Sequence, residues 1–377
     1  MADGKREAIC QSTYAKLKNA KVANIEAVIG MDGFVDDIIH IVDKRHSSDR
    51  FDRLGNISDF ARRIDEASGC STNLEMIVVA QKLGGNGPIM ANALAKIGLR
   101  VTYIGNLGYP DLHSVFQEMA GRSKVLSIAP PCQTEALEFL DGKLMLGKLS
   151  STAEINWKNI SERIGIPELT KMIENSRLLG TVNWTMLPFM NDIWDHLLLD
   201  ILPKVNKAPR MLFVDLADPE KRIKSDLLTA LEKLGQFEAY LEVVLGLNLK
   251  EAIQVCKALE LPIGPDPEKR IETMAADIRK RLSLNTVVIH PRAGAAAADV
   301  RGSAIFDGPF VPEPKISTGA GDHFNTGFVL GRLLGMELHE ALCTGTATSG
   351  YYVRTAQSPT LAQLAEFVEK LPLPQSN

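Results

Sequence analysis

The chain has 377 residues, of which 45% are hydrophobic and 23% are charged, and its formal net charge is −4. These proportions are typical of an ordinary globular protein, and the slightly acidic balance provides no basic surface for nucleic acid. No apolar run is long enough to span a membrane, and residues 1–21 lack the apolar core of a signal peptide. The five cysteines are widely spaced and form no CxxC or CxxH pair, which indicates reduced thiols in the cytoplasm.

The N-terminal part of the chain predicts a helix, a strand and then a group of acids. Residues 4–20 have an amphipathic helical pattern, and residues 25–30 form a short apolar strand. Asp32, Asp36 and Asp37 follow that strand closely. Because ligands of α/β proteins bind beyond the carboxyl ends of the strands, these acids are candidate ligand-binding residues. The alternative is that they are exposed loop residues, as most acids are.

A first Gly-rich turn lies at residues 84–87. Residues 74–80 before it have the composition of a strand, and residues 89–97 after it carry apolar side chains at helical spacing. A further strand is expected at 101–108. The succession of strand, turn, helix and strand predicts a parallel α/β sheet.

The middle and the end of the chain continue this alternation, with one exception. Residues 134–149 favour a β-hairpin about Asp141-Gly142, outside the main sheet. Further strands are expected at 178–184, 211–218, 243–248 and 286–291, and helices at 57–68, 225–235, 249–259, 337–356 and 360–371. The fold predicted for residues 1–377 is a single doubly wound α/β domain, with a mostly parallel sheet and helices on both faces.

A second Gly-rich turn, Ser317 to Asp322, opens a helix and carries the strongest chemical signal. Glycine allows the backbone to approach a ligand closely, and the free N–H groups of a helix start attract anions such as phosphate. Asp322 is placed to accept a proton from a hydroxyl whose oxygen attacks phosphorus. The alternative is that Asp322 only caps the helix.

Three motifs in this order resemble those of the ribokinase-like sugar kinases, the PfkB carbohydrate kinase family: GGNGP at 84–88, NLKE at 248–251 and TGAGD at 318–322. The similarity extends from about residue 25 to 371. The resemblance implies a doubly wound domain with a small β lid formed by segments 37–45, 73–82 and 132–149. It also implies that ATP donates its γ-phosphate to a hydroxymethyl group of a sugar or sugar-like alcohol, with Mg²⁺ and a monovalent cation as cofactors.

The resemblance also implies a role for individual residues. Asp322 would be the general base, the backbone of Gly319, Ala320 and Gly321 the anion hole, and Glu251 the residue that orders Mg²⁺ through water. The implied substrate-binding residues are Asp32, Asp36, Gly85, Asn86 and Asn183, and the implied nucleotide-binding residues are Asn248, His290, Gly294, Thr318 and Thr346.

Several positions depart from the family pattern. Ile89 stands where the family has Asn, residues 290–294 replace its T-x-G-x-x-G strand, residues 316–318 replace its Asp-Thr-Thr, and residues 345–347 replace its Ala-Asn-Ala. Two alternatives therefore stay open, a non-catalytic sugar- or nucleotide-binding regulator and a nucleoside kinase. The expected partner is a small molecule and not a nucleic acid or a membrane, and a homodimer through the lid is compatible with the resemblance. Residues 45–75 carry no recognisable chemistry.

Overall fold

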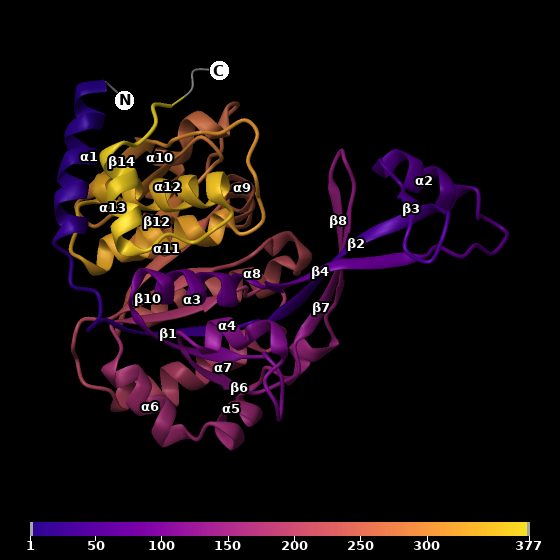
Figure 1. Cartoon of the computed structure of the whole chain (residues 1–377). Coiled ribbons are helices and arrows are strands. Elements are labelled where there is room, and N and C mark those ends of the chain that lie inside the picture. Colours follow the sequence, from indigo (N-terminus) through magenta and orange to yellow (C-terminus); the bar gives the residue numbers. More distant parts are fainter. Residues whose placement is uncertain (1–2, 375–377) are drawn as a thin grey trace.

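A nine-stranded sheet crosses the molecule, and helices cover both of its faces (Figure 1). The computed structural model describes residues 3–374. The strands lie in the order β14 (Gly302–Asp307), β13 (Gly294–Asp299), β12 (Thr286–Ile289), β11 (Glu242–Leu247), β10 (Met211–Asp215), β9 (Leu178–Val182), β1 (Glu26–Met31), β5 (Arg100–Gly105) and β6 (Lys124–Ser127). All neighbours from β12 to β6 are parallel, whereas β13 and β14 add an antiparallel hairpin at one edge. The predicted fold class, doubly wound and mostly parallel, is confirmed.

Successive residues of the central strands point to opposite faces of the sheet, as the pleat requires. In β10, Met211 and Phe213 pack into one apolar cluster and Leu212 and Val214 into the other. The first cluster lies under α1 (Asp3–Lys18), α3 (Asn86–Ile97), α4 (Gln117–Ala120), α11 (Ala320–Leu333), α12 (Leu338–Thr355) and α13 (Leu361–Glu369). The second lies under α5 (Trp157–Arg163), α6 (Ile166–Asn175), α7 (Met190–His196), α8 (Lys224–Phe237), α9 (Leu249–Ala258) and α10 (Ile271–Leu282).

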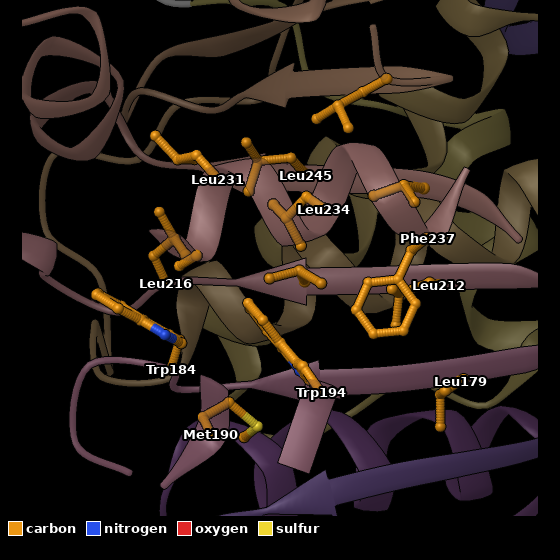
Figure 2. Packing of buried hydrophobic residues seen from close by; sticks show 14 of the residues in the cluster. Leu179, Trp184, Met190, Trp194, Leu212, Leu216, Leu231, Leu234, Phe237 and Leu245 are labelled. Carbon is orange, nitrogen blue, oxygen red and sulfur yellow. The ribbon is translucent and has the colours of Figure 1, made fainter. Parts of the chain in front are cut away.

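Figure 2 shows the second cluster, in which aromatic rings from different helices meet over the sheet. Trp194 of α7 meets Phe237 of α8 edge to face, with ring centroids 6.1 Å apart. Both side chains are fully buried, as is Leu212 of β10 beneath them. Continuous burial on both faces explains why these strands appear in the sequence as unbroken apolar runs. Among the described residues, no helix combines the length and the apolarity needed to cross a membrane.

A smaller, five-stranded sheet projects from the main body (Figure 1). It consists of β2 (Phe34–Arg45), β3 (Phe51–Arg53), β4 (Met76–Gly84), β7 (Cys132–Glu138) and β8 (Lys143–Lys148). The long strand β2 pairs with β4, β7 and β3, and β7 and β8 form the hairpin expected about Asp141. The segments expected to form a lid, 37–45, 73–82 and 132–149, lie in or beside these strands. The opening and closing of a lid formed by these segments remain a prediction.

Residues 45–75 enlarge this second sheet. They contribute β3 and helix α2 (Ile57–Asp65), and Phe60 of α2 packs on Phe139 with ring centroids 5.5 Å apart. Together with Ile39 and Leu137 these rings form a small apolar cluster that is separate from the two clusters of the main sheet. The insertion therefore packs against the tip of the β7–β8 hairpin.

The succession of elements placed the strand before the first Gly-rich turn in the parallel sheet, and this prediction was wrong, whereas the resemblance had placed residues 73–82 among the lid segments. β4 pairs antiparallel with β2 in the second sheet and is not a strand of the parallel sheet. Two of its apolar residues, Val78 and Val79, are 55% and 45% exposed. A short apolar run predicts a strand but does not specify which sheet it joins, because both sheets accept the same residues.

Candidate active site

The second Gly-rich turn starts helix α11, and Asp322 lies in the first turn of that helix. Gly319 is the N-cap residue, with a φ of 86° that favours glycine, so Asp322 is not the cap. The Asp322 side chain is buried, and its Oδ1 accepts a hydrogen bond from Asn86 Nδ2 at 3.0 Å. Burial raises the pKa of Asp322 to about 7, although the Asn86 hydrogen bond acts in the opposite direction. A carboxyl group with this pKa can accept a proton near neutral pH.

Two aromatic side chains that the sequence did not single out hold this turn in place. His323 Nδ1 donates to the carbonyl of Gly319 at 2.7 Å, and the Tyr352 hydroxyl donates to the carbonyl of Thr318 at 3.0 Å. The two rings stack with centroids 3.6 Å apart. Burial lowers the pKa of His323 to about 4, so the ring is neutral and its Nε2 accepts from the hydroxyl of Ser358. The carbonyls of Thr318 and Gly319 are thus occupied by side chains.

Asp32 lies where β1, β9 and the start of α3 meet, which is the point where the strand order reverses direction. Its carboxylate accepts from the backbone N–H of Asn86 at 2.9 Å, from that of Gly87 at 2.8 Å and from Asn183 Nδ2 at 2.7 Å. Burial raises the pKa of Asp32 to about 6 against these hydrogen bonds. A side chain at Gly85 would place its Cβ 2.9 Å from Asp32 Oδ2, so this turn needs glycine. Asp32 therefore fastens the first Gly-rich turn.

Asp36 occupies a different environment from Asp32, although only four positions separate them. It lies on β2 and lines a cavity of about 1120 Å³ between the second sheet and the main body. Burial raises the pKa of Asp36, whereas a hydrogen bond from Thr134 and the charge of Lys143 lower it. Because Gly84 on the neighbouring strand β4 has no side chain, the carboxylate of Asp36 has room. Asp36 thus faces the larger cavity, whereas Asp32 and Asn183 line neither this cavity nor the next.

A second cavity, of about 410 Å³, lies on the other side of the Gly-rich turn. Its lining includes four of the five predicted nucleotide-binding residues: Asn248, His290, Gly294 and Thr346. The fifth, Thr318, lines the larger cavity. Ala320 and Gly321 of the predicted anion hole also line the smaller cavity, and Ser317 lines both. The turn at 317–321 therefore separates two spaces, one on each side.

His290 gives the smaller cavity an aromatic wall with a free polar atom. Its ring lies 4.6 Å from that of Phe324, centroid to centroid. Burial lowers the pKa of His290 to about 4, so the ring is neutral. Its Nε2 is buried and has no hydrogen-bond partner within residues 3–374. Since buried polar atoms are normally paired, this nitrogen is available to a ligand.

The NxxE tetrad forms the start of helix α9. Asn248 Oδ1 accepts from the N–H of Glu251 at 3.0 Å, and Glu251 Oε2 accepts from the N–H of Asn248 at 2.9 Å. This reciprocal pair is a capping box. The other carboxylate oxygen of Glu251 accepts from the N–H of Asp218 at 2.9 Å. Glu251 therefore has a structural role in addition to any role toward a metal.

Asp215, which sequence reasoning missed, lies at the end of β10 beside this cap. It is buried and accepts from the N–H of Ala217 at 2.9 Å and from Asn325 Nδ2 at 2.8 Å. Its pKa is raised by burial and then by repulsion from Glu251 and Asp322. The signal that could have found it is the one that pointed to Asp32, an acid directly after an apolar strand.

A family model of prokaryotic ketohexokinase matches residues 3–371 of the chain. The chain belongs to this family. It is 28% identical over 342 residues to a ketohexokinase from Haloferax volcanii, covering 90% of each sequence. The fold is similar to that of a carbohydrate kinase from Agrobacterium tumefaciens, with a TM-score of 0.62, 17% identity and coverage of 92% of this chain and 98% of that one. It is also similar to ribokinase of Arabidopsis thaliana complexed with ribose and ATP, with a TM-score of 0.62, 14% identity and coverage of 92% and 99%.

Membership of the ketohexokinase family confirms two predictions from the sequence, the ribokinase-like family and a carbohydrate kinase. Kinases of the ribokinase family use ATP, and solved relatives hold ATP or ADP. The smaller cavity fits such a nucleotide, because it has aromatic walls, a free imidazole nitrogen and the N-terminal end of α11.

A magnesium ion fits the acids beside that cavity without being enclosed by them. No group of three or more His, Cys, Asp or Glu side chains in residues 3–374 is placed to hold a metal directly. However, Mg²⁺ commonly keeps several waters and uses one or two carboxylates together with substrate phosphates. Burial is the main cause of the raised pKa of Asp215, and repulsion from Glu251 and Asp322 raises it further. A nearby cation would relieve this repulsion. The residues present are therefore compatible with a water-mediated Mg²⁺.

Proposed function

We propose that this protein transfers the γ-phosphate of ATP to a hydroxymethyl group of a ketohexose, with Asp322 as the general base. The observation that carries the proposal is the position of Asp322, which follows Gly319–Gly321 directly at the start of α11. A cavity suited to a nucleotide and a larger cavity suited to a sugar flank the turn before it. The name of the Haloferax volcanii relative, ketohexokinase, supports the choice of acceptor.

The reaction requires a base, a charge-stabilising site and two positioned reactants. Asp322 accepts the proton of the sugar hydroxyl as that oxygen forms a bond to the γ-phosphorus and the bond to ADP breaks. The N–H groups at the start of α11 stabilise negative charge on the transferred phosphoryl group. Asn86 holds the carboxylate of Asp322 through its hydrogen bond, so the base keeps one orientation.

The larger cavity supplies the acceptor site. Asp36 faces it from β2 and can accept hydrogen bonds from sugar hydroxyls. Ile89 lines the same cavity and lies beside Gly319, so the floor next to the turn is apolar. When bound, Mg²⁺ would neutralise charge on the phosphates of the nucleotide, with Glu251 and Asp215 as the residues that hold its waters.

The test is an assay of ADP release by the purified protein with ATP, Mg²⁺ and a panel of ketohexoses, aldohexoses and nucleosides. We expect the highest kcat/KM with a ketohexose. Asp322→Asn should lower kcat by about 10²- to 10⁴-fold, the scale of general-base catalysis. Asp192→Asn, an exposed acid of α7, is the matched control and should leave kcat unchanged. If Asp322→Asn keeps near-normal turnover, or if no ketohexose is phosphorylated, the proposal is wrong.

A further inference from the structure

Lys143 of the second sheet reaches the Gly-rich turn of the main body. Its Nζ donates a hydrogen bond to Thr318 Oγ1, and Thr318 directly precedes Gly319. An ammonium group has three donors, so two remain available after this contact. Within the described part of the chain, no acid forms an ion pair with Lys143, whereas Lys148 on the same strand pairs with Glu135. A positive charge without an ion-pair partner therefore lies in the larger cavity next to the turn, where it also lowers the pKa of Asp36.

The insertion at residues 45–75 fixes the hairpin tip that precedes Lys143. Asp141 Oδ1 accepts from the backbone N–H of Ile57 at 3.0 Å, at the start of α2. The N–H of Leu140 donates to the carbonyl of Gly55 at 2.7 Å. These two bonds, together with the contact between Phe60 and Phe139, connect residues 139–141 of the tip to the insertion. The tip of the hairpin thus lies against α2 and the residues that precede it.

We propose that Lys143 is a catalytic residue that donates a hydrogen bond to the phosphoryl group during transfer, and that residues 45–75 position it for this contact. The proposal rests on the phosphotransfer reaction proposed above. Lys143 transfers no proton and forms no covalent bond. Its ammonium group stabilises the negative charge that the three equatorial phosphoryl oxygens carry as the bond to ADP breaks. None of residues 45–75 lines the larger cavity, so the insertion acts through the hairpin.

The first test compares Lys143→Met with Lys148→Met as the matched control on the same strand. Lys143→Met should lower kcat by about 10- to 100-fold, the range expected for the loss of one charged hydrogen bond, and change the KM of the sugar by less than about threefold. Lys143→Arg should restore part of kcat because it keeps the charge. Lys148→Met should leave kcat unchanged. A kcat of Lys143→Met within about twofold of wild type overturns the proposal.

A second test does not depend on the identity of the sugar. Calorimetry should show that Lys143→Met weakens ATP binding by about tenfold, the loss of one charged hydrogen bond, and leaves ADP binding unchanged. This comparison stands even if no ketohexose is phosphorylated, so failure of the proposed function and failure of the role of Lys143 are distinguishable. Equal effects on ATP and ADP, or no effect on either, overturn the contact with the phosphoryl group.

A third test separates catalysis from simple fastening of the second sheet. Thr318→Val removes the partner of Lys143 but keeps its charge, so it should lower kcat much less than Lys143→Met does. Equal losses would show that Lys143 only fastens the sheet and would overturn the proposal. Asp141→Ala should lower kcat in the wild type and have no further effect in the Lys143→Met background. Additive losses would overturn the positioning role of the insertion.

Discussion

Asn86 and Asp322 are 236 positions apart in the chain, yet Asn86 Nδ2 lies 3.0 Å from Asp322 Oδ1. Each residue lies in the first turn of a helix that follows a Gly-rich turn, so the two turns meet at this hydrogen bond. Asp32 holds the first turn in place by accepting hydrogen bonds from the backbone N–H groups of Asn86 and Gly87. The proposed base is therefore held by the first Gly-rich turn, and a change in that turn alters the environment of the base.

The hydrogen bond between Asn86 and Asp322 should influence the pH dependence of the reaction. Burial raises the pKa of Asp322 to about 7, and the bond from Asn86 lowers it because a donor stabilises the charged carboxylate. A base must be deprotonated, so kcat/KM should fall as the pH drops through about 7. Asn86→Ala removes the lowering contribution and should move the acid limb to higher pH. Asn92→Ala, which lines the cavity without touching Asp322, should leave the limb in place. If the acid limb of the pH profile of Asn86→Ala stays in place or moves to lower pH, this account is wrong.

Glu251 should matter for both stability and magnesium. Glu251→Gln places an amide N–H₂ against one of two backbone N–H groups, and we expect the free energy of unfolding to fall by about 1–3 kcal/mol, the cost of an unpaired buried group. It should also raise the magnesium concentration needed for half-maximal activity. Glu340 is the buried acid of the capping box of α12, so Glu340→Gln is the matched control.

Urea unfolding and magnesium titrations of activity measure the two effects. The control should lose stability without any change in its magnesium requirement. If Glu251→Gln and Glu340→Gln behave alike in both measurements, Glu251 has only its capping role.

Substitution of Asp36 should weaken binding of the sugar, whereas substitution of Asp32 should lower the stability of the protein. Asp36→Asn should weaken binding of the sugar at least tenfold and leave ATP binding unchanged, since a charged hydrogen bond contributes about 1.5–3 kcal/mol. Asp32→Asn should instead lower the free energy of unfolding by about 1–3 kcal/mol, because its amide cannot accept from all three donors. Calorimetry and urea unfolding check the pair. Loss of sugar affinity in Asp32→Asn alone, with stability retained, would reverse the assignment.

The second sheet should close over the acceptor. Two of its apolar residues, Met145 and Leu146 of β8, are 45% and 49% exposed, and Met145 lines the larger cavity. Binding of the sugar should slow amide exchange in residues 134–149 far more than ATP alone does. Hydrogen exchange followed by mass spectrometry provides the measurement, with α8 as an internal reference. Unchanged exchange in the hairpin upon sugar binding would contradict closure.

Much of the fold was predictable, because the central strands are buried on both faces and appear as apolar runs. The strands β9 to β12 lie within the ranges expected from the sequence or extend one residue beyond them. The hairpin of β13 and β14 was not predicted. Four alanines, Ala295 to Ala298, fill β13, and alanine favours helices over strands, so packing overrides local preference there.

The sequence by itself determined the features that depend on neighbours within one or two turns: the Gly-rich turns, the helix starts, the hairpin at Asp141 and the family motifs. Only the tertiary structure decided which of the acids meet. Asp32 follows β1 directly and accepts hydrogen bonds from the start of α3, whereas Asp36 lies on β2 and faces a cavity. The contacts of Asn86 with Asp322 and of Lys143 with Thr318 join segments 236 and 175 positions apart. Such contacts depend on strand order and on which sheet each strand joins, and the local pattern of residues does not encode either.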